Sequence, residues 1–171
     1  MGKFLGVLCI LGGISGYLFH WQQEKRMRRE RLHAFILFLQ KTRYAMDNEN
    51  IKIGKLLQNY QTKELVLQDT LQEIAVRLSQ NLYPNGPSLW EEVFREKEQN
   101  WNMDEETFGF MIYAGNGLFG KTKGENICFL QKSIYKLEEQ ERKIKEMDAN
   151  EKKVWIPVGM LSGMMLVILF I

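Results

Sequence analysis

The chain has 171 residues, of which 45% are hydrophobic and 26% are charged, and its net charge at pH 7 is only +2. This small excess of positive charge does not favour a nucleic-acid-binding protein, and the length suits one ordinary domain with additional segments. The two cysteines, Cys9 and Cys128, are too far apart in the chain to form a metal-ligand motif.

The first predicted element is an apolar segment from Phe4 to about Trp21 (FLGVLCILGGISGYLFHW). Its length is close to the minimum of about 17 residues that a helix needs to cross the hydrocarbon core of a bilayer. A cleaved secretory signal peptide is the alternative. However, the bulky residues 19–21 (FHW) stand where such a peptide carries small residues at its cleavage site. We therefore expect residues 1–21 to form an uncleaved N-terminal transmembrane helix.

The next part of the chain predicts two long helices with a short helix between them. Apolar residues recur at helical spacing in residues 24–46 and again in residues 67–82, and a short helix is expected at residues 51–60. Residues 84–87 (PNGP) mark a loop. The two apolar stripes consist of Leu32, Phe35, Ile36, Leu39 and Met46, and of Leu67, Leu71, Ile74, Leu78 and Leu82.

Capping signals predict further helices after this loop. Ser88, followed three residues later by Glu91, predicts a capping box at the start of a helix over residues 89–99. Asn102 or Asp104 then caps a helix that includes Phe108 and Ile112. Residues 115–124 contain four glycines and predict a loop, and the last helix is expected to begin near residue 125. Trp90 and Trp101 are interpreted as packing residues of the core.

Within that glycine-rich segment, Gly115–Thr122 (GNGLFGKT) matches the pattern G-x-x-x-x-G-K-[ST] of a loop that binds nucleotide phosphates. In such a loop Lys121 contacts the β- and γ-phosphates and Thr122 holds Mg²⁺. The apolar residues 108–114 could form the preceding strand. Against this, residues 123–124 separate the pattern from the following helix, and no other buried strand or metal-binding aspartate is evident. We favour an interhelical turn and keep a membrane-anchored nucleotide-binding protein as the alternative.

The chain ends in a second apolar segment, residues 154–171 (VWIPVGMLSGMMLVILFI), which predicts a C-terminal transmembrane helix. Basic residues follow the first segment and precede the second, so the positive-inside rule places residues 22–153 in the cytoplasm and both chain ends outside. Each apolar segment also carries two glycines four residues apart, which could pack the two helices together or join copies of the protein. The basic residues are Lys25, Arg26, Arg28, Arg29, Arg31, Arg142, Lys143, Lys145, Lys152 and Lys153.

Several features of the chain together resemble one known family. They are the short anchor with a glycine-rich core, the charged segment leading into residues 31–35 (RLHAF), the turn at residues 114–118 (AGNGL), and the ending in which residues 152–153 (KK) precede residues 158–163 (VGMLSG). These features resemble the stage III sporulation protein AB family of endospore-forming bacteria. The sequence departs from the family pattern at Phe119, where the family has a glycine.

This resemblance implies a helical cytoplasmic domain similar to that of the inner-membrane platform protein of type II secretion and type IV pilus machines. It also implies membership of an export-like complex between mother cell and forespore, on the mother-cell side of the membrane around the forespore. The implied partners are a secretion-type ATPase and the other stage III sporulation membrane subunits.

We therefore expect an all-α protein: a bundle of about five to six helices (residues 22–153) between transmembrane helices at residues 1–21 and 154–171. On this interpretation the chain is a non-enzymatic scaffold in the cell membrane, with no cofactor and with no catalytic, cofactor-binding or metal-binding residue. It contacts the lipid bilayer and its protein partners, with further copies of itself as an additional candidate partner, and it does not bind nucleic acid.

Overall fold

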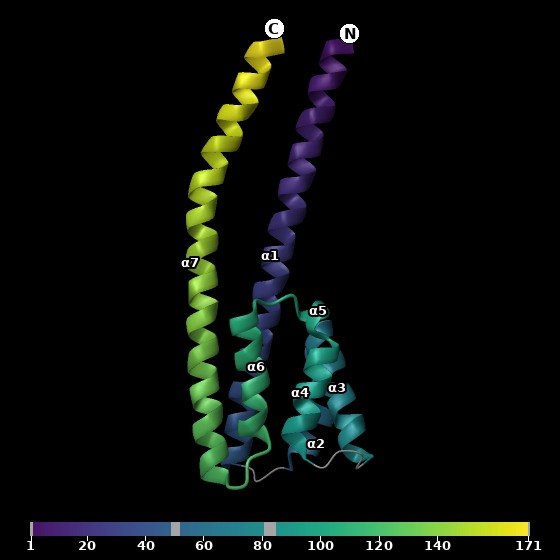
Figure 1. Ribbon diagram of the computed structural model, residues 1–171, viewed down its shortest axis with the longest axis vertical. Helices are drawn as coiled ribbons and strands as arrows, with labels where there is room; N and C mark the ends of the chain where they lie inside the picture. The colour runs from purple at the N-terminus through teal and green to yellow at the C-terminus, as the bar shows by residue number, and fades with distance from the viewer. Residues whose placement is uncertain (1, 49–51, 81–84, 171) are drawn as a thin grey trace. The chain divides into compact units, whose positions relative to one another are not determined.

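A computed structural model describes residues 2–48, 52–80 and 85–170, without the side chains of residues 2–19, 152 and most of 154–170. Within these ranges the chain is all-α, with seven helices and no strand, which confirms the predicted class (Figure 1). The helices are α1 (Gly2–Asn48), α2 (Ile53–Asn59), α3 (Leu65–Ser79), α4 (Gly86–Glu96), α5 (Glu98–Trp101), α6 (Glu105–Leu118) and α7 (Lys123–Phe170).

The chain divides into two compact units. The terminal unit consists of residues 1–27 and 142–171, and the bundle unit consists of residues 28–141. The long helices α1 and α7 each contribute residues to both units.

The two segments predicted to cross a membrane, residues 1–21 and 154–171, consist mainly of residues whose side chains lie outside the described part of the chain. Among the residues that the structure does describe, no helix contains an apolar stretch long enough to span a bilayer.

The start of α4 differs from the prediction. The helix begins at Gly86, and its N-cap is Asn85, whose side-chain oxygen accepts a hydrogen bond from the Ser88 amide at 2.8 Å. Ser88 therefore donates through its backbone and is not the cap, so the predicted capping box is wrong. Pro87 fits the first turn because the amides there have no partner within the helix. The predicted helix over residues 89–99 is thus displaced and ends at Glu96, before the short α5.

The predicted cap at Asp104 is confirmed. Its carboxylate accepts hydrogen bonds from the Thr107 amide at 2.8 Å and from the Thr107 hydroxyl at 2.9 Å. Helix α6 then continues to Leu118, so the predicted loop at residues 115–124 shrinks to residues 119–122. Residues 108–114 are helical, and the possible strand there is wrong.

An aromatic core fills the bundle unit between α1, α4 and α5, which agrees with the interpretation of the two tryptophans as packing residues. The Trp90 ring stacks on Phe94 at 4.5 Å between centroids, and Phe94 stacks on Trp101 at 5.4 Å. Phe35 of α1 contacts Phe94 and Trp101 edge-on. Such pairs contribute about 0.5–1.5 kcal/mol each beyond the burial of their apolar area. The fully buried aromatic residues are Phe35, Phe38, Trp90, Phe94 and Trp101.

The remaining helices of the bundle unit pack against one another as follows. Helix α4 packs against α3 and α6, and α2 packs against α3 (Figure 1). Helices α1 and α7 are joined by Gln40, whose amide donates to the Glu138 carboxylate at 2.8 Å. The stripe predicted for α1 is buried as expected at Leu32, Phe35, Ile36 and Leu39.

Candidate functional site

The glycines of the phosphate-loop pattern lie at helix contacts. Gly115 and Gly117 are buried in α6, and a Cβ atom at Gly115 would come within 2.5 Å of Cδ1 of the Trp90 indole. At Gly117 a Cβ atom would lie 3.0 Å from the backbone nitrogen of Leu130 in α7. The absence of a side chain at these two positions therefore lets α6 approach α4 and α7 closely.

This arrangement differs from a loop that cradles phosphate. Such a loop needs a run of backbone amides that point into one hollow. Here residues 115–118 continue α6, where amides bond within the helix, and the Phe119 amide donates to the Gly115 carbonyl at 3.1 Å. Lys121 and Thr122 are exposed, and the Thr122 hydroxyl accepts a hydrogen bond from the Glu125 amide at 3.3 Å. Thr122 thus caps α7, which begins directly after it at residue 123, two residues earlier than predicted.

Other polar residues with chemically reactive side chains are spread over the surface. Nδ1 of His33 lies 3.2 Å from a carboxylate oxygen of Glu141, which places it in the contact between α1 and α7. Cys128 is an exposed free thiol on α7. Within the described part of the chain, no three His, Cys, Asp or Glu side chains gather as metal ligands would.

The basic run after the first apolar segment pairs with acidic residues of the same chain. Within the terminal unit, the Lys25 ammonium bonds to Glu151 and lies 3.6 Å from Asp148 on α7. Within the bundle unit, the Arg28 guanidinium bonds to Asp104 at the start of α6. These cations therefore join α1 to other helices in each unit. Burial opposes the charged form of Asp104, but hydrogen bonds from Thr107 and the charge of Arg28 outweigh it and lower its pKa.

Ion pairs also connect α3 to α4. The Lys97 ammonium bonds to Asp69 and lies 2.7 Å from Glu73, and Arg77 lies 2.5 Å from Glu73 and 2.6 Å from Glu96. The hydrogen bond from Lys97, followed by the bond and charge of Arg77, lowers the pKa of Glu73 despite partial burial. Burial works against the charge on Lys97, but its bonds to the two carboxylates outweigh this and raise its pKa. These ion pairs form a clamp that holds α3 and the C-terminal end of α4 together.

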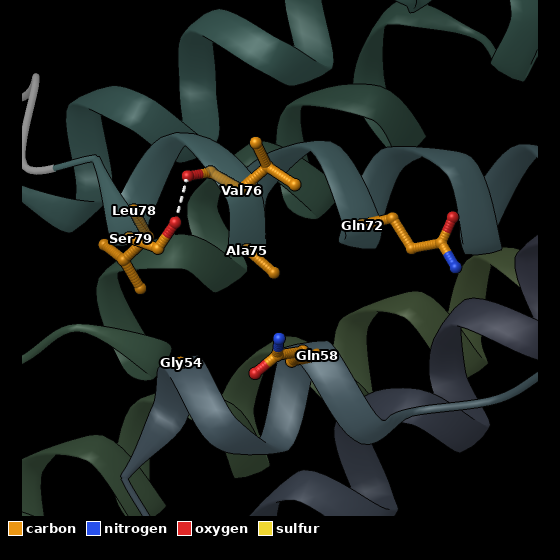
Figure 2. A pocket seen from close by; sticks show the side chains of 7 residues that line it. All are labelled: Gly54, Gln58, Gln72, Ala75, Val76, Leu78 and Ser79. Atoms are coloured by element: carbon orange, nitrogen blue, oxygen red, sulfur yellow. Dashed lines mark hydrogen bonds between the residues drawn. The ribbon is translucent and has the colours of Figure 1, made fainter.

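The described part of the bundle unit has at least two grooves in its surface. The first has a volume of about 450 Å³ and lies between α2 and α3, where Gln58 and Ala75 face each other (Figure 2). Its lining contains no charged residue: Gly54, Gln58, Gln72, Ala75, Val76, Leu78 and Ser79.

The second groove, which we name the α1 groove, has two adjoining hollows of about 450 and 270 Å³ that share Tyr60. The core-facing stripe of α1, on which the predicted helix rests, does not indicate this groove. The available signal was a second row of residues at steps of three and four on the same helix, at Ala34, Leu37, Lys41 and Tyr44. The lining residues are Ala34, Leu37, Lys41 and Ala45 of α1, with Lys55, Leu56, Asn59, Tyr60, Gln61, Thr62 and Lys63.

Comparison with known proteins gives one result. The family model described as stage III sporulation protein AB matches residues 3–171. No curated protein and no solved structure matches the chain significantly.

Proposed function

Because the chain belongs to the stage III sporulation protein AB family, we propose that it is a non-enzymatic platform subunit of a sporulation export-like complex. In this role it joins a cytoplasmic secretion-type ATPase to the membrane between mother cell and forespore. The observation that carries the proposal is the family match itself, which extends over residues 3–171 and so includes both apolar ends and the helical bundle.

The proposed arrangement has the chain cross the membrane twice, through residues 1–21 and 154–171, with residues 22–153 in the mother-cell cytoplasm. Support comes from the apolar composition of the two ends and from the basic residues that flank them on the inner side. The clustering of both chain ends in one terminal unit fits two helices that enter the bilayer together.

At the one motif that suggested nucleotide chemistry, Gly115–Thr122, the structure supports a role in helix packing and capping. Gly115 and Gly117 serve helix packing, and Thr122 caps a helix. In the proposed complex, nucleotide hydrolysis therefore belongs to the separate ATPase, and this chain transmits its movement or positions it.

The test is crosslinking of the full-length tagged protein in membranes of sporulating cells, followed by purification and mass spectrometry. We expect recovery of a secretion-type ATPase and of other stage III membrane subunits. An unrelated two-span membrane protein with the same tag, made at the same level, serves as the control. Recovery of neither partner class from cells that make the protein would refute the platform role and leave the family membership unchanged.

A further inference from the structure

Within the bundle unit, helix α1 carries a second row of residues that faces away from the core. Ala34, Leu37, Lys41 and Tyr44 follow one another at steps of three, four and three residues. Leu37 is 39% exposed and Tyr44 is 66% exposed, although the neighbouring core residues are fully buried. Steps that alternate between three and four keep side chains in one line along a helix, which is the pattern that receives another helix.

Tyr60, which lines the α1 groove, also contacts the aromatic core. Its ring lies edge-on to Phe38 at 5.0 Å between centroids. The Lys41 ammonium lies 5.5 Å from the centroid of the same ring. Tyr60 is shared by both hollows, so the groove has one fixed aromatic position in its middle. Because this side chain is already held in place, binding of a partner at the groove costs little of its conformational entropy.

The rim of the α1 groove is positively charged. Its lining includes Lys41, Lys55 and Lys63 and no carboxylate. Among the described residues, neither Lys55 nor Lys63 forms an ion pair. The neighbouring Glu64 is engaged by Arg31, at 3.2 Å from Nε to the carboxylate oxygen. The groove between α2 and α3 has no charged lining residue at all, so the charge distinguishes one groove from the other.

We propose that the α1 groove binds an acidic amphipathic helix of a partner protein. The apolar side of that helix packs on Ala34, Leu37 and Tyr60, and its carboxylates pair with the three lysines. A helix satisfies its own backbone hydrogen bonds, and the groove offers side chains and no strand edge to an incoming peptide. Charge complementarity sets the orientation and selects acidic over basic partners. The inference deepens the proposed platform role and rests on it.

The test uses the full-length protein in membranes of sporulating cells, with a benzophenone amino acid in place of Leu37. After illumination, mass spectrometry identifies the crosslinked segment. We expect a segment of a different protein that has net negative charge and apolar residues at steps of three and four. The same photoreactive residue in place of Val76, in the uncharged groove, should not capture that segment.

A charge-reversal series makes the test specific. The double variant Lys55→Glu/Lys63→Glu should lower the crosslink yield at position 37 about tenfold, since two ion pairs become repulsions. Lys132→Glu, an exposed lysine of α7 outside the groove, should leave the yield unchanged. Circular dichroism of each variant checks that the helices are retained.

Several results would overturn the inference. They are crosslinks to phospholipid, to a second copy of this chain or to a basic segment, an unchanged yield in the double variant, and no crosslink from position 37. If any of these accompanies recovery of the ATPase and the other subunits, the platform role stands and only the groove assignment fails. If no subunit of the complex is recovered, both fail.

Discussion

Gly115 of α6 lies against the indole of Trp90 in α4 so closely that a Cβ atom at position 115 would come within 2.5 Å of the ring. The variant Gly115→Ala should therefore destabilise the protein, by about 1–3 kcal/mol, because the buried tryptophan has to move. Gly109→Ala is the matched control on the same helix, since nothing lies within 4 Å of its Cβ position. It should be neutral or stabilising by up to about 1 kcal/mol, because alanine favours helix over glycine. Urea denaturation of the full chain in detergent gives both values, and equal stability of the two variants would contradict the contact.

The same contact leads to a prediction about nucleotides. Purified full-length protein should show no saturable, Mg²⁺-dependent binding of ATP, because the amides of residues 115–118 are used within α6. Lys121→Ala should leave stability within about 0.5 kcal/mol of the unaltered protein, as expected for an exposed side chain. Equilibrium dialysis with labelled ATP is the measurement. Saturable binding that Lys121→Ala abolishes would restore the nucleotide-site hypothesis.

The two core tryptophans should respond differently to replacement by phenylalanine. The Trp90 indole N–H donates to the Met111 carbonyl at 3.1 Å, whereas the buried Trp101 indole nitrogen has no hydrogen-bond partner within the described part of the chain. Both variants lose ring volume, but only Trp90→Phe also loses a hydrogen bond. We expect Trp90→Phe to be more destabilising than Trp101→Phe, by about 1 kcal/mol. Denaturation of both proteins under one set of conditions provides the comparison, and the reverse order would show that the Trp90 bond contributes nothing.

Glu73 should make stability depend on pH in the acid range. Its pKa is lowered in the folded protein, so its contribution is fully present above the ordinary carboxyl range and is lost as pH falls through the folded pKa. At pH 7, Glu73→Gln should cost at most about 1 kcal/mol, because the clamp is partly exposed to solvent. The difference from the unaltered protein should shrink as pH falls below the ordinary carboxyl range. Glu98→Gln removes a carboxylate that has no ion pair among the described residues, and it should show a smaller difference at pH 7.

Cys128 offers a test of the proposed topology. With Cys9→Ser, Cys128 is the only thiol in the chain, and it is exposed. A membrane-impermeant maleimide should leave it unlabelled in intact cells and label it after permeabilisation, because residues 22–153 are proposed to face the cytoplasm. The experiment uses non-sporulating cells made to express the protein, so that the membrane that holds it faces the medium. A Gly2→Cys protein that also lacks both native thiols is the control, and it should react in these cells without permeabilisation. Labelling of Cys128 from outside would invert the proposed orientation.

Prediction from the sequence was most accurate for features that depend on residues within one helix. The α1 stripe at Leu32, Phe35 and Leu39 is buried as periodicity indicated, and Asp104 caps α6 through a local hydrogen bond. Prediction failed at the end of α6, because four glycines lower helix propensity and the compensating contact of Gly115 with Trp90 is tertiary. That contact joins residues 25 positions apart, so no local pattern could reveal it.

The α1 groove shows a different limit of sequence reasoning. The helical spacing of Leu37 and Tyr44 is visible in the sequence. However, the sequence of a helix with apolar residues on two sides does not show which side is buried in its own domain. Only the packing of α4 and α5 on the side of Phe35 shows that Leu37 is left outside.

The pairing of α1 with α7 has a consequence for biosynthesis. Gln40 of α1 meets Glu138 of α7 across 98 positions of sequence, and Phe35 meets Trp101 across 66, so α1 leaves the ribosome well before the residues that cover it. At synthesis rates of about 5–20 residues per second, the interval between Gln40 and Glu138 lasts roughly 5–20 s. During that interval the apolar side of the nascent α1 lacks its native neighbours, which makes it a ready substrate for chaperones.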